Sequence, residues 1–240
     1  TMLMSLNLPL PKTIFAHGWW TNEGQKISKS LGNVIDPNEI VARYGLDQVR
    51  YFLMREVPFG KDGDFSHRAM INRINGELAN DFGNLAQRVL SMIEKYCDSK
   101  LPAPNELSQK DQELINLARK LIVKVREKIV EYQAFHEALI VIWEFVRHSN
   151  AYVAEQEPWA LRKNDIPRME TVLYIAYEAI RYLAIICQPF MPDSCHKMLN
   201  QLGIGIESRQ FTNLRVDKNN FVGVALPSPV PIFPRLEQNE

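Results

Sequence analysis

Apolar residues recur every three or four positions between residues 78 and 202, which is the spacing of one face of an α-helix. Four long stretches carry this pattern, marked by Leu78 to Met92, Leu114 to Val125, Phe135 to Val146 and Met169 to Cys187. A fifth, shorter helix is predicted over 193–202, with Gly203 just after its end. Because amphipathic helices bury their apolar faces against one another, the pattern predicts a helix bundle. A chain of 240 residues is long enough to bury such a core without disulfides or metals.

A smaller helical unit is predicted ahead of the bundle. Asp36 is placed to cap a short helix that Gly45 closes, and a second helix is expected over 47–56. A turn-rich connection, 58–64, leads to Ser66, which we predict to cap the next helix.

The two ends of the chain have a different character. Near the start, the run 13–17 is typical of a β-strand, but a lone strand leaves its backbone groups unpaired. We therefore expect the first residues to be the last βα part of a larger domain, and the sequence to begin inside that domain. The proline-rich end, from 221 onward, is predicted to be an extended strap over the protein surface.

Charge and cysteine content exclude several classes of protein. Basic and acidic residues cancel at 28 each, so nucleic acid binding must depend on local patches. Cys97, Cys187 and Cys195 form no C-x-x-C pair, which argues against a disulfide framework and against zinc, and we predict no metal site. No apolar run approaches a membrane span and no signal peptide is evident, so a cytoplasmic location is expected.

Phosphate-binding chemistry is concentrated between Gly24 and Gly32. Lys26 and Lys29 alternate there with two serines, and the glycines allow sharp turns that bring backbone N–H groups close to an anion. The segment matches neither a Walker A loop nor a G-x-G-x-x-G unit. Its residues alone fit either a polyphosphate loop or a solvated surface loop. No histidine lies in the segment, so nucleophilic catalysis by its serines is not expected.

The run Lys26-Ile27-Ser28-Lys29-Ser30 resembles the KMSKS signature of class I aminoacyl-tRNA synthetases. His17-Gly18-Trp19-Trp20 ahead of it and Gly32-Asn33 behind it resemble the methionyl-tRNA synthetase arrangement. The resemblance implies that ATP, accompanied by Mg²⁺, is bound at this end of the chain. The residues implied in ATP binding are Lys26, Ser28, Lys29, Ser30, His17, Gly18 and Trp20, with Lys29 as the main catalytic residue and Lys26 as its helper.

Asn84 and Arg88 lie one turn apart on the flank of the first apolar stripe, where they are either a polar helix edge or a base-reading pair. Their run, Asn84-Leu85-Ala86-Gln87-Arg88, resembles the N-L-x-x-R element that methionyl-tRNA synthetases use against the anticodon. Pro158 and Trp159 resemble the anticodon segment of the same family. Trp159 is either a core anchor or a platform for a splayed base, and burial in the core would weaken the resemblance.

Further along, Gln188 to Pro192 and Phe233 to Arg235 resemble later elements of the same family, so the resemblance covers nearly the whole chain. It implies a mainly α protein with four parts. These are a remnant of a Rossmann-type catalytic domain (1–35), a stem-contact helical unit (36–77), an anticodon-binding helix bundle (78–225) and an extended tail (226–240).

The implied protein is a methionine–tRNA ligase whose partners are tRNA(Met), methionine and ATP, and which is expected to be a monomer. The residues present are expected to be inactive alone, because the family carries its HIGH-type motif, methionine pocket and zinc-bearing insertion upstream. Two alternatives remain at this point. One is another class I synthetase, such as a leucyl or cysteinyl enzyme, and the other is a stand-alone helical module that binds RNA or another partner.

Overall fold

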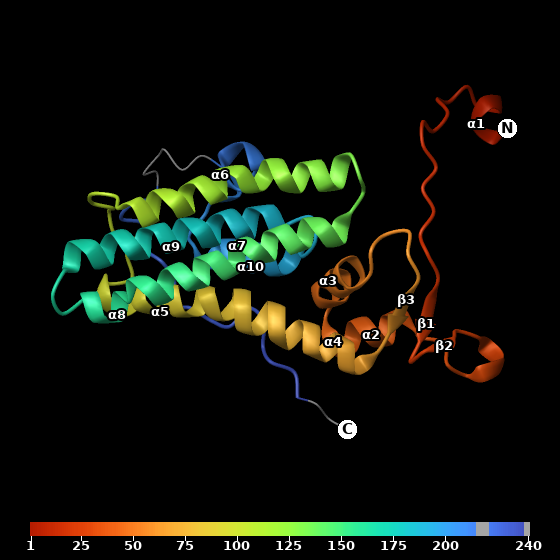
Figure 1. Cartoon of the computed structure of the whole chain (residues 1–240), viewed down its shortest axis with the longest axis horizontal. Helices are drawn as coiled ribbons and strands as arrows, with labels where there is room; N and C mark the ends of the chain where they lie inside the picture. Colours follow the sequence, from red (N-terminus) through yellow and green to blue (C-terminus); the bar gives the residue numbers. More distant parts are fainter. Residues whose placement is uncertain (215–220, 238–240) are drawn as a thin grey trace.

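The computed structural model describes residues 1–214 and 221–237. Long helices pack side by side over most of its length, and a small three-stranded sheet and two short helices lie at one end (Figure 1). The predicted mainly α bundle is therefore confirmed. The described bundle and its attachments comprise α6 (Gln109–Val130), α7 (Phe135–Gln156), α8 (Pro158–Leu161), α9 (Ile166–Cys187), α10 (Pro192–Gln201) and the short turns η3 (Ile206–Ser208) and η4 (Phe211–Asn213).

Helix α9 is the centre of the bundle. Every residue from Thr171 to Cys187 is buried, including the ion pair between Arg181 and Glu178, whose closest atoms are 2.7 Å apart. A helix that is apolar on nearly all sides must be surrounded by others, and α5 to α7 and α10 all contact it. The sequence pattern predicted one apolar face on this helix, whereas the structure buries the helix on all sides.

A buried carboxylate joins the ends of three helices. Asp111 lies in the first turn of α6, where it forms a capping box with Ser108. Arg168 of α9 donates to it at 2.5 Å, and the Tyr152 hydroxyl of α7 donates at 2.5 Å. Burial opposes the charge of Asp111, but the hydrogen bonds from Arg168 and Tyr152 hold its pKa below the usual value. Asp111 thereby fixes the relative positions of α6, α7 and α9.

One continuous helical rod carries the chain from the small unit into the bundle. It consists of α4 (His67–Arg73), the π-helical segment η2 (Ile74–Gly83) and α5 (Asn84–Tyr96). Side chains of α7 donate to carbonyls of η2: Trp143 Nε1 to Glu77 at 3.3 Å and Asn150 Nδ2 to Asp81 at 3.0 Å. The domain boundary predicted at 77/78 falls inside this rod, and it stays a prediction.

The predicted strand over 13–17 is wrong. Those residues are exposed and extended without strand pairing, and α1 (Met2–Ser5) lies beyond them at the end of an arm that leaves the body of the protein (Figure 1). The strands are β1 (Trp20–Asn22), β2 (Gln25–Lys26) and β3 (Gly63–Phe65), in the order β2-β1-β3. Strand β1 pairs antiparallel with the neighbouring β2 and parallel with β3, which is distant in the sequence.

The helical unit between the sheet and the bundle agrees with the prediction. Asp36 accepts a hydrogen bond from the Asn38 amide at 2.8 Å and caps α2 (Pro37–Tyr44), which Gly45 ends at a φ of 92°. Helix α3 (Leu46–Glu56) follows, and the Ser66 side chain caps α4 as expected. Tyr51 of α3 packs against Trp143 of α7, with ring centroids 4.7 Å apart, so this unit is joined to the bundle through aromatic contact.

The proline-rich C-terminal segment is an extended strap, as predicted, over its described residues; 238–240 lie outside them. Side-chain amides hold its backbone at several points. Gln201 bonds both backbone groups of Val230, at 2.8 and 3.0 Å, and Asn75 does the same for Leu236, at 2.9 and 2.8 Å. The strap therefore runs along the rod from the bundle to the start of η2.

Deleting residues 1–16 should leave a single cooperative melt, with a melting temperature within about 3 °C of the full chain. These residues are all exposed, and their aromatic contact with the body is the stacking of Phe15 on Phe59 at 5.0 Å. Thermal unfolding followed by circular dichroism measures this directly. A deletion extended through Lys26, which removes β1 and β2, should lower the melting temperature further. Loss of helical signal on the shorter deletion would contradict separate folding of the bundle.

Candidate functional sites

The lysine–serine segment begins at a tight hairpin. Glu23 and Gly24 join β1 to β2 with φ angles of 51° and 75°, which is the pattern of a type I′ turn. Asp64 of β3 accepts from the Gly24 amide at 2.8 Å and from the Thr21 hydroxyl at 2.5 Å. These two hydrogen bonds, the Thr21 one first, lower the pKa of Asp64, so the carboxylate that anchors the hairpin stays charged.

Beyond the hairpin the chain forms a short projecting loop. Lys26 ends β2, Lys29 begins the 3-10 turn η1 (Lys29–Leu31), and Gly32 follows at a φ of 67°. The Ser28 and Ser30 hydroxyls lie 2.8 Å apart. Both lysine side chains are exposed, and neither forms an ion pair with any residue that the structure describes. The loop thus presents two uncompensated cations and two hydroxyls, which suits an anionic ligand.

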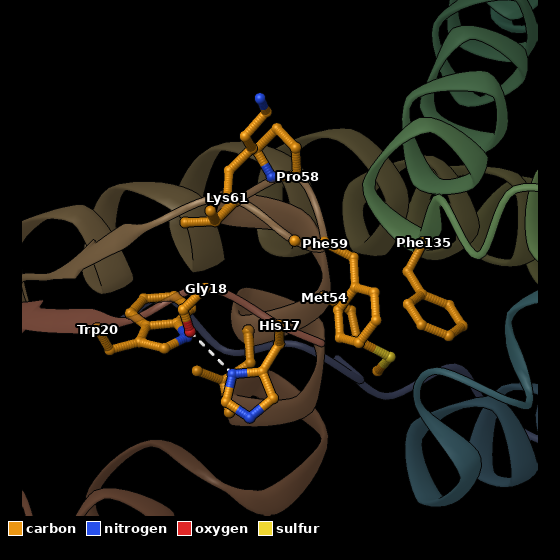
Figure 2. Close-up of a pocket in the computed structure, with 11 residues that line it drawn as sticks. His17, Gly18, Trp20, Met54, Pro58, Phe59, Lys61 and Phe135 are labelled. Carbon is orange, nitrogen blue, oxygen red and sulfur yellow. Dashed lines mark hydrogen bonds between the residues drawn. The ribbon is translucent and has the colours of Figure 1, made fainter. Parts of the chain in front are cut away.

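His17, Gly18 and Trp20 come together at a cavity of about 330 Å³ (Figure 2). Its walls are mainly apolar side chains from the end of α3, the turn after it and Phe135 of α7. His17 Nδ1 donates to the Gly18 carbonyl at 2.8 Å, as the dashed line in Figure 2 shows. A Cβ atom at Gly18 would lie 2.0 Å from the Lys61 carbonyl oxygen, so only glycine allows this close approach. None of Lys26 to Ser30 lines this cavity.

Asn84 and Arg88 lie at the start of α5, directly after the π-helical segment. Asn84 is exposed and lines a groove of about 470 Å³ between the rod and the strap. Arg88 is half-buried, and its Nε and Nη2 atoms are buried with no hydrogen-bond partner among the described residues. Unpaired buried guanidinium donors are unfavourable, so these two atoms need a partner that the described residues do not supply.

Trp159 lies on the one-turn helix α8. Glu157 breaks the chain from α7 with a φ of 46°, and the buried Pro158 occupies the first position of α8. Trp159 is 40% exposed, whereas Trp143 in the same bundle is fully buried. Burial of Trp159 in the core would have weakened the family resemblance, and the structure does not bury it.

Arg162 places α8 relative to the rod, and sequence reasoning missed it. Its guanidinium lies over the Tyr96 ring, 4.8 Å from the centroid, so α8 lies against the C-terminal end of α5. The lysine–serine loop lies near the other end of the molecule, beside the sheet (Figure 1). The structure thus separates the lysine–serine loop from the predicted anticodon residues. Asn84 and Arg88 lie in the middle part of the rod, and α8 with Trp159 lies near its C-terminal end.

The remaining chemistry-bearing groups form no further centre. The part of the chain that the structure describes holds no cluster of three His, Cys, Asp or Glu side chains suited to a metal ion. Burial raises the pKa of Cys97 to about 11 and that of Cys187 to about 12, so these thiols are not activated nucleophiles. None of the described helices is long and apolar enough to cross a membrane.

The site geometry and two family models define the class of protein. A model described as "tRNA synthetases class I (M)" matches residues 1–90, which contain the lysine–serine loop. A model of the anticodon binding domain of methionyl tRNA ligase matches residues 101–240. The chain belongs to the methionyl-tRNA synthetase family, as the sequence motifs predicted.

Individual relatives agree with this assignment. A methionine–tRNA ligase of Brucella suis is 52% identical over 97% of this chain, and one of Mycobacterium leprae is 45% identical over 99%. A solved structure of Mycobacterium tuberculosis methionyl-tRNA synthetase in complex with methionyl-adenylate matches with a TM-score of 0.91 at 45% identity, over 97% of this chain. The chain spans 45% and 44% of the two curated relatives, and 46% of the solved chain.

Proposed function

We propose that this chain is the part of a methionine–tRNA ligase that supplies the ATP-binding loop and reads the anticodon of tRNA(Met). In the first step the carboxylate oxygen of methionine attacks the α-phosphorus of ATP and pyrophosphate leaves. In the second step the terminal adenosine hydroxyl of the tRNA attacks the methionyl carbonyl, and AMP leaves.

Lys29 is the principal catalytic residue in this proposal. Negative charge accumulates on the departing pyrophosphate, and a cation placed there stabilises the transition state more than the ground state. Lys26 assists, and the Ser28 and Ser30 hydroxyls can donate to phosphate oxygens. The exposure of both ammonium groups and their lack of ion-pair partners among the described residues support these roles.

His17, Gly18 and Trp20 are proposed to lie against the adenosine part of ATP. The loop itself does not fit a magnesium site, because it carries no carboxylate between Lys26 and Ser30. Any Mg²⁺ is therefore expected to arrive on the phosphates of ATP rather than on ligands of this loop.

In the part of the protein distant from this loop, Trp159 is proposed to stack on an anticodon base while Asn84 and Arg88 donate to neighbouring base edges. The observation that carries this half of the proposal is the 40% exposure of Trp159 in a bundle that otherwise buries Trp143 completely. Pro158 contributes by fixing the backbone before the indole.

The family matches favour methionine over leucine and cysteine as the amino acid. A stand-alone RNA-binding module would need neither the adenylate chemistry nor the sequence CAU. The domain limits 1–35, 36–77, 78–225 and 226–240, a cytoplasmic location and a monomeric state are part of the same proposal. The chain spans less than half of the length of these relatives, and the HIGH-type motif and methionine pocket that the family resemblance implies are not among its residues, so the chain alone is expected to be inactive.

The direct test is a charging assay with the longer protein that contains this chain, supplied with methionine, leucine or cysteine and the cognate tRNA. Only methionine should be attached to tRNA at a rate well above background. The same assay with these 240 residues alone should give no product. Charging of leucine or cysteine in place of methionine would overturn the proposal.

A further inference from the structure

The side chain of Asn33 contacts the backbone of the lysine–serine loop at Lys26 and at Ser28. Its Oδ1 atom accepts from the Ser28 amide at 2.8 Å, and its Nδ2 atom donates to the Lys26 carbonyl at 3.0 Å. The Asn33 side-chain amide thus supplies hydrogen bonds that these two backbone groups would otherwise form with water or with a neighbouring strand. Lys29 lies between Ser28 and Asn33 in the sequence. The two hydrogen bonds therefore hold together the ends of the short segment that contains Lys29.

Asn33 is itself fixed to the sheet. The Asn22 side chain of β1 donates to the Asn33 carbonyl at 2.9 Å. Gly32, just before it, has a φ of 67°, which turns the chain back toward the hairpin. The hydrogen bonds of Asn33 therefore connect the loop to β1, and β1 pairs with β3, which leads through Ser66 into the rod.

We propose that Asn33 is a positioning residue that holds Lys29 where the leaving pyrophosphate forms, an inference that rests on the proposed function. Lys29 begins η1 and forms no ion pair with a described residue, so its ammonium group is placed by the backbone alone. Releasing that backbone would let the loop sample many arrangements, of which few place the cation correctly. The Asn33 contacts restrict the loop before ATP binds.

Asn33→Ala in the longer protein should lower kcat of methionine-dependent pyrophosphate exchange about tenfold, the effect of losing two ordinary hydrogen bonds. The KM for methionine should not change, because Asn33 does not contact the amino acid in this proposal. Asn38→Ala is the matched control: Asn38 is exposed in the first turn of α2, five residues on, and should leave kcat unchanged. Asn22→Ala keeps the hydrogen bonds from Asn33 to Lys26 and Ser28 but removes the one that ties Asn33 to β1. This variant should therefore lower kcat less than Asn33→Ala does.

Two further measurements separate positioning from general destabilisation. Hydrogen exchange of the Ser28 amide in this chain should accelerate in Asn33→Ala while the melting temperature stays within about 3 °C. In a Lys29→Ala background, adding Asn33→Ala should have almost no further effect on kcat, because a residue that acts through Lys29 has nothing left to position.

Full additivity of the two substitutions, or a wild-type kcat in Asn33→Ala, would overturn the role of Asn33. If instead Lys29→Ala itself exchanged pyrophosphate at the wild-type rate, the proposed function of the loop would fail. The two failures are therefore distinguishable.

Discussion

Replacing Lys29 with alanine is expected to slow methionyl-adenylate formation by about 10²–10³-fold in the methionine–tRNA ligase proposed above. The lysine is exposed on a short loop and has no ion-pair partner within the described residues, so its charge is available to a ligand. A preorganised cation that meets developing negative charge acts mainly on the transition state. The decrease should therefore appear in kcat of pyrophosphate exchange, with little change in the KM for methionine.

Two control variants sharpen this experiment. Lys26→Ala should cause a smaller decrease, because Lys26 ends a strand and only assists in the proposed mechanism. Lys12→Ala removes an exposed lysine from the N-terminal arm and should leave the rate unchanged. A wild-type rate of pyrophosphate exchange in Lys29→Ala would contradict a catalytic role for this loop.

Replacing Trp159 with alanine is expected to weaken binding of a CAU stem-loop by about 5- to 150-fold, the range of one base–aromatic stacking contact. The salt dependence of binding should stay nearly unchanged, because stacking releases no counterions. Fluorescence or calorimetric titration across a salt series measures both quantities. Since α8 is a single turn on the surface and the Trp159 side chain is partly exposed, the fold should survive the substitution.

The matched control is Trp19→Ala, which removes a tryptophan that is 83% exposed on the N-terminal segment. It should bind the CAU loop as the wild type does. Lys124→Gln removes an exposed cation from α6 and tests for phosphate contact. If Lys124 contacts RNA phosphate, this change reduces the dependence of affinity on salt concentration and leaves the preference for CAU unchanged. If Trp159→Ala and Trp19→Ala lowered the affinity for the CAU stem-loop equally, Trp159 would have no specific role in binding.

Local sequence signals predicted much of the fold. The repeat of apolar residues located the long helices, and side chains with a direct local role, such as Asp36, Ser66 and Gly203, marked helix ends correctly. These features depend on residues within one turn of one another. The candidate site residues were proposed in the same way, because the motifs that carry the family resemblance are short runs.

Features that depend on distant partners escaped prediction. The strand expected over 13–17 lies instead at Trp20–Asn22, because β3 provides the backbone partners that fix it. The π-helical segment is stabilised by Trp143 and Asn150 of another helix, and no local pattern signals it. The burial of the Arg88 guanidinium and the cation–π contact of Arg162 likewise arise only when helices pack together.

The most direct test of the account is a titration of this chain with a CAU stem-loop and with a stem-loop of the same composition but scrambled anticodon. Both RNAs carry the same phosphate charge, so any difference in affinity reports base recognition alone. The CAU loop should bind at least tenfold more tightly, and Trp159→Ala should remove most of this difference. Equal affinity for the two loops, with no effect of Trp159→Ala, would contradict anticodon recognition and leave a general RNA-binding helical module.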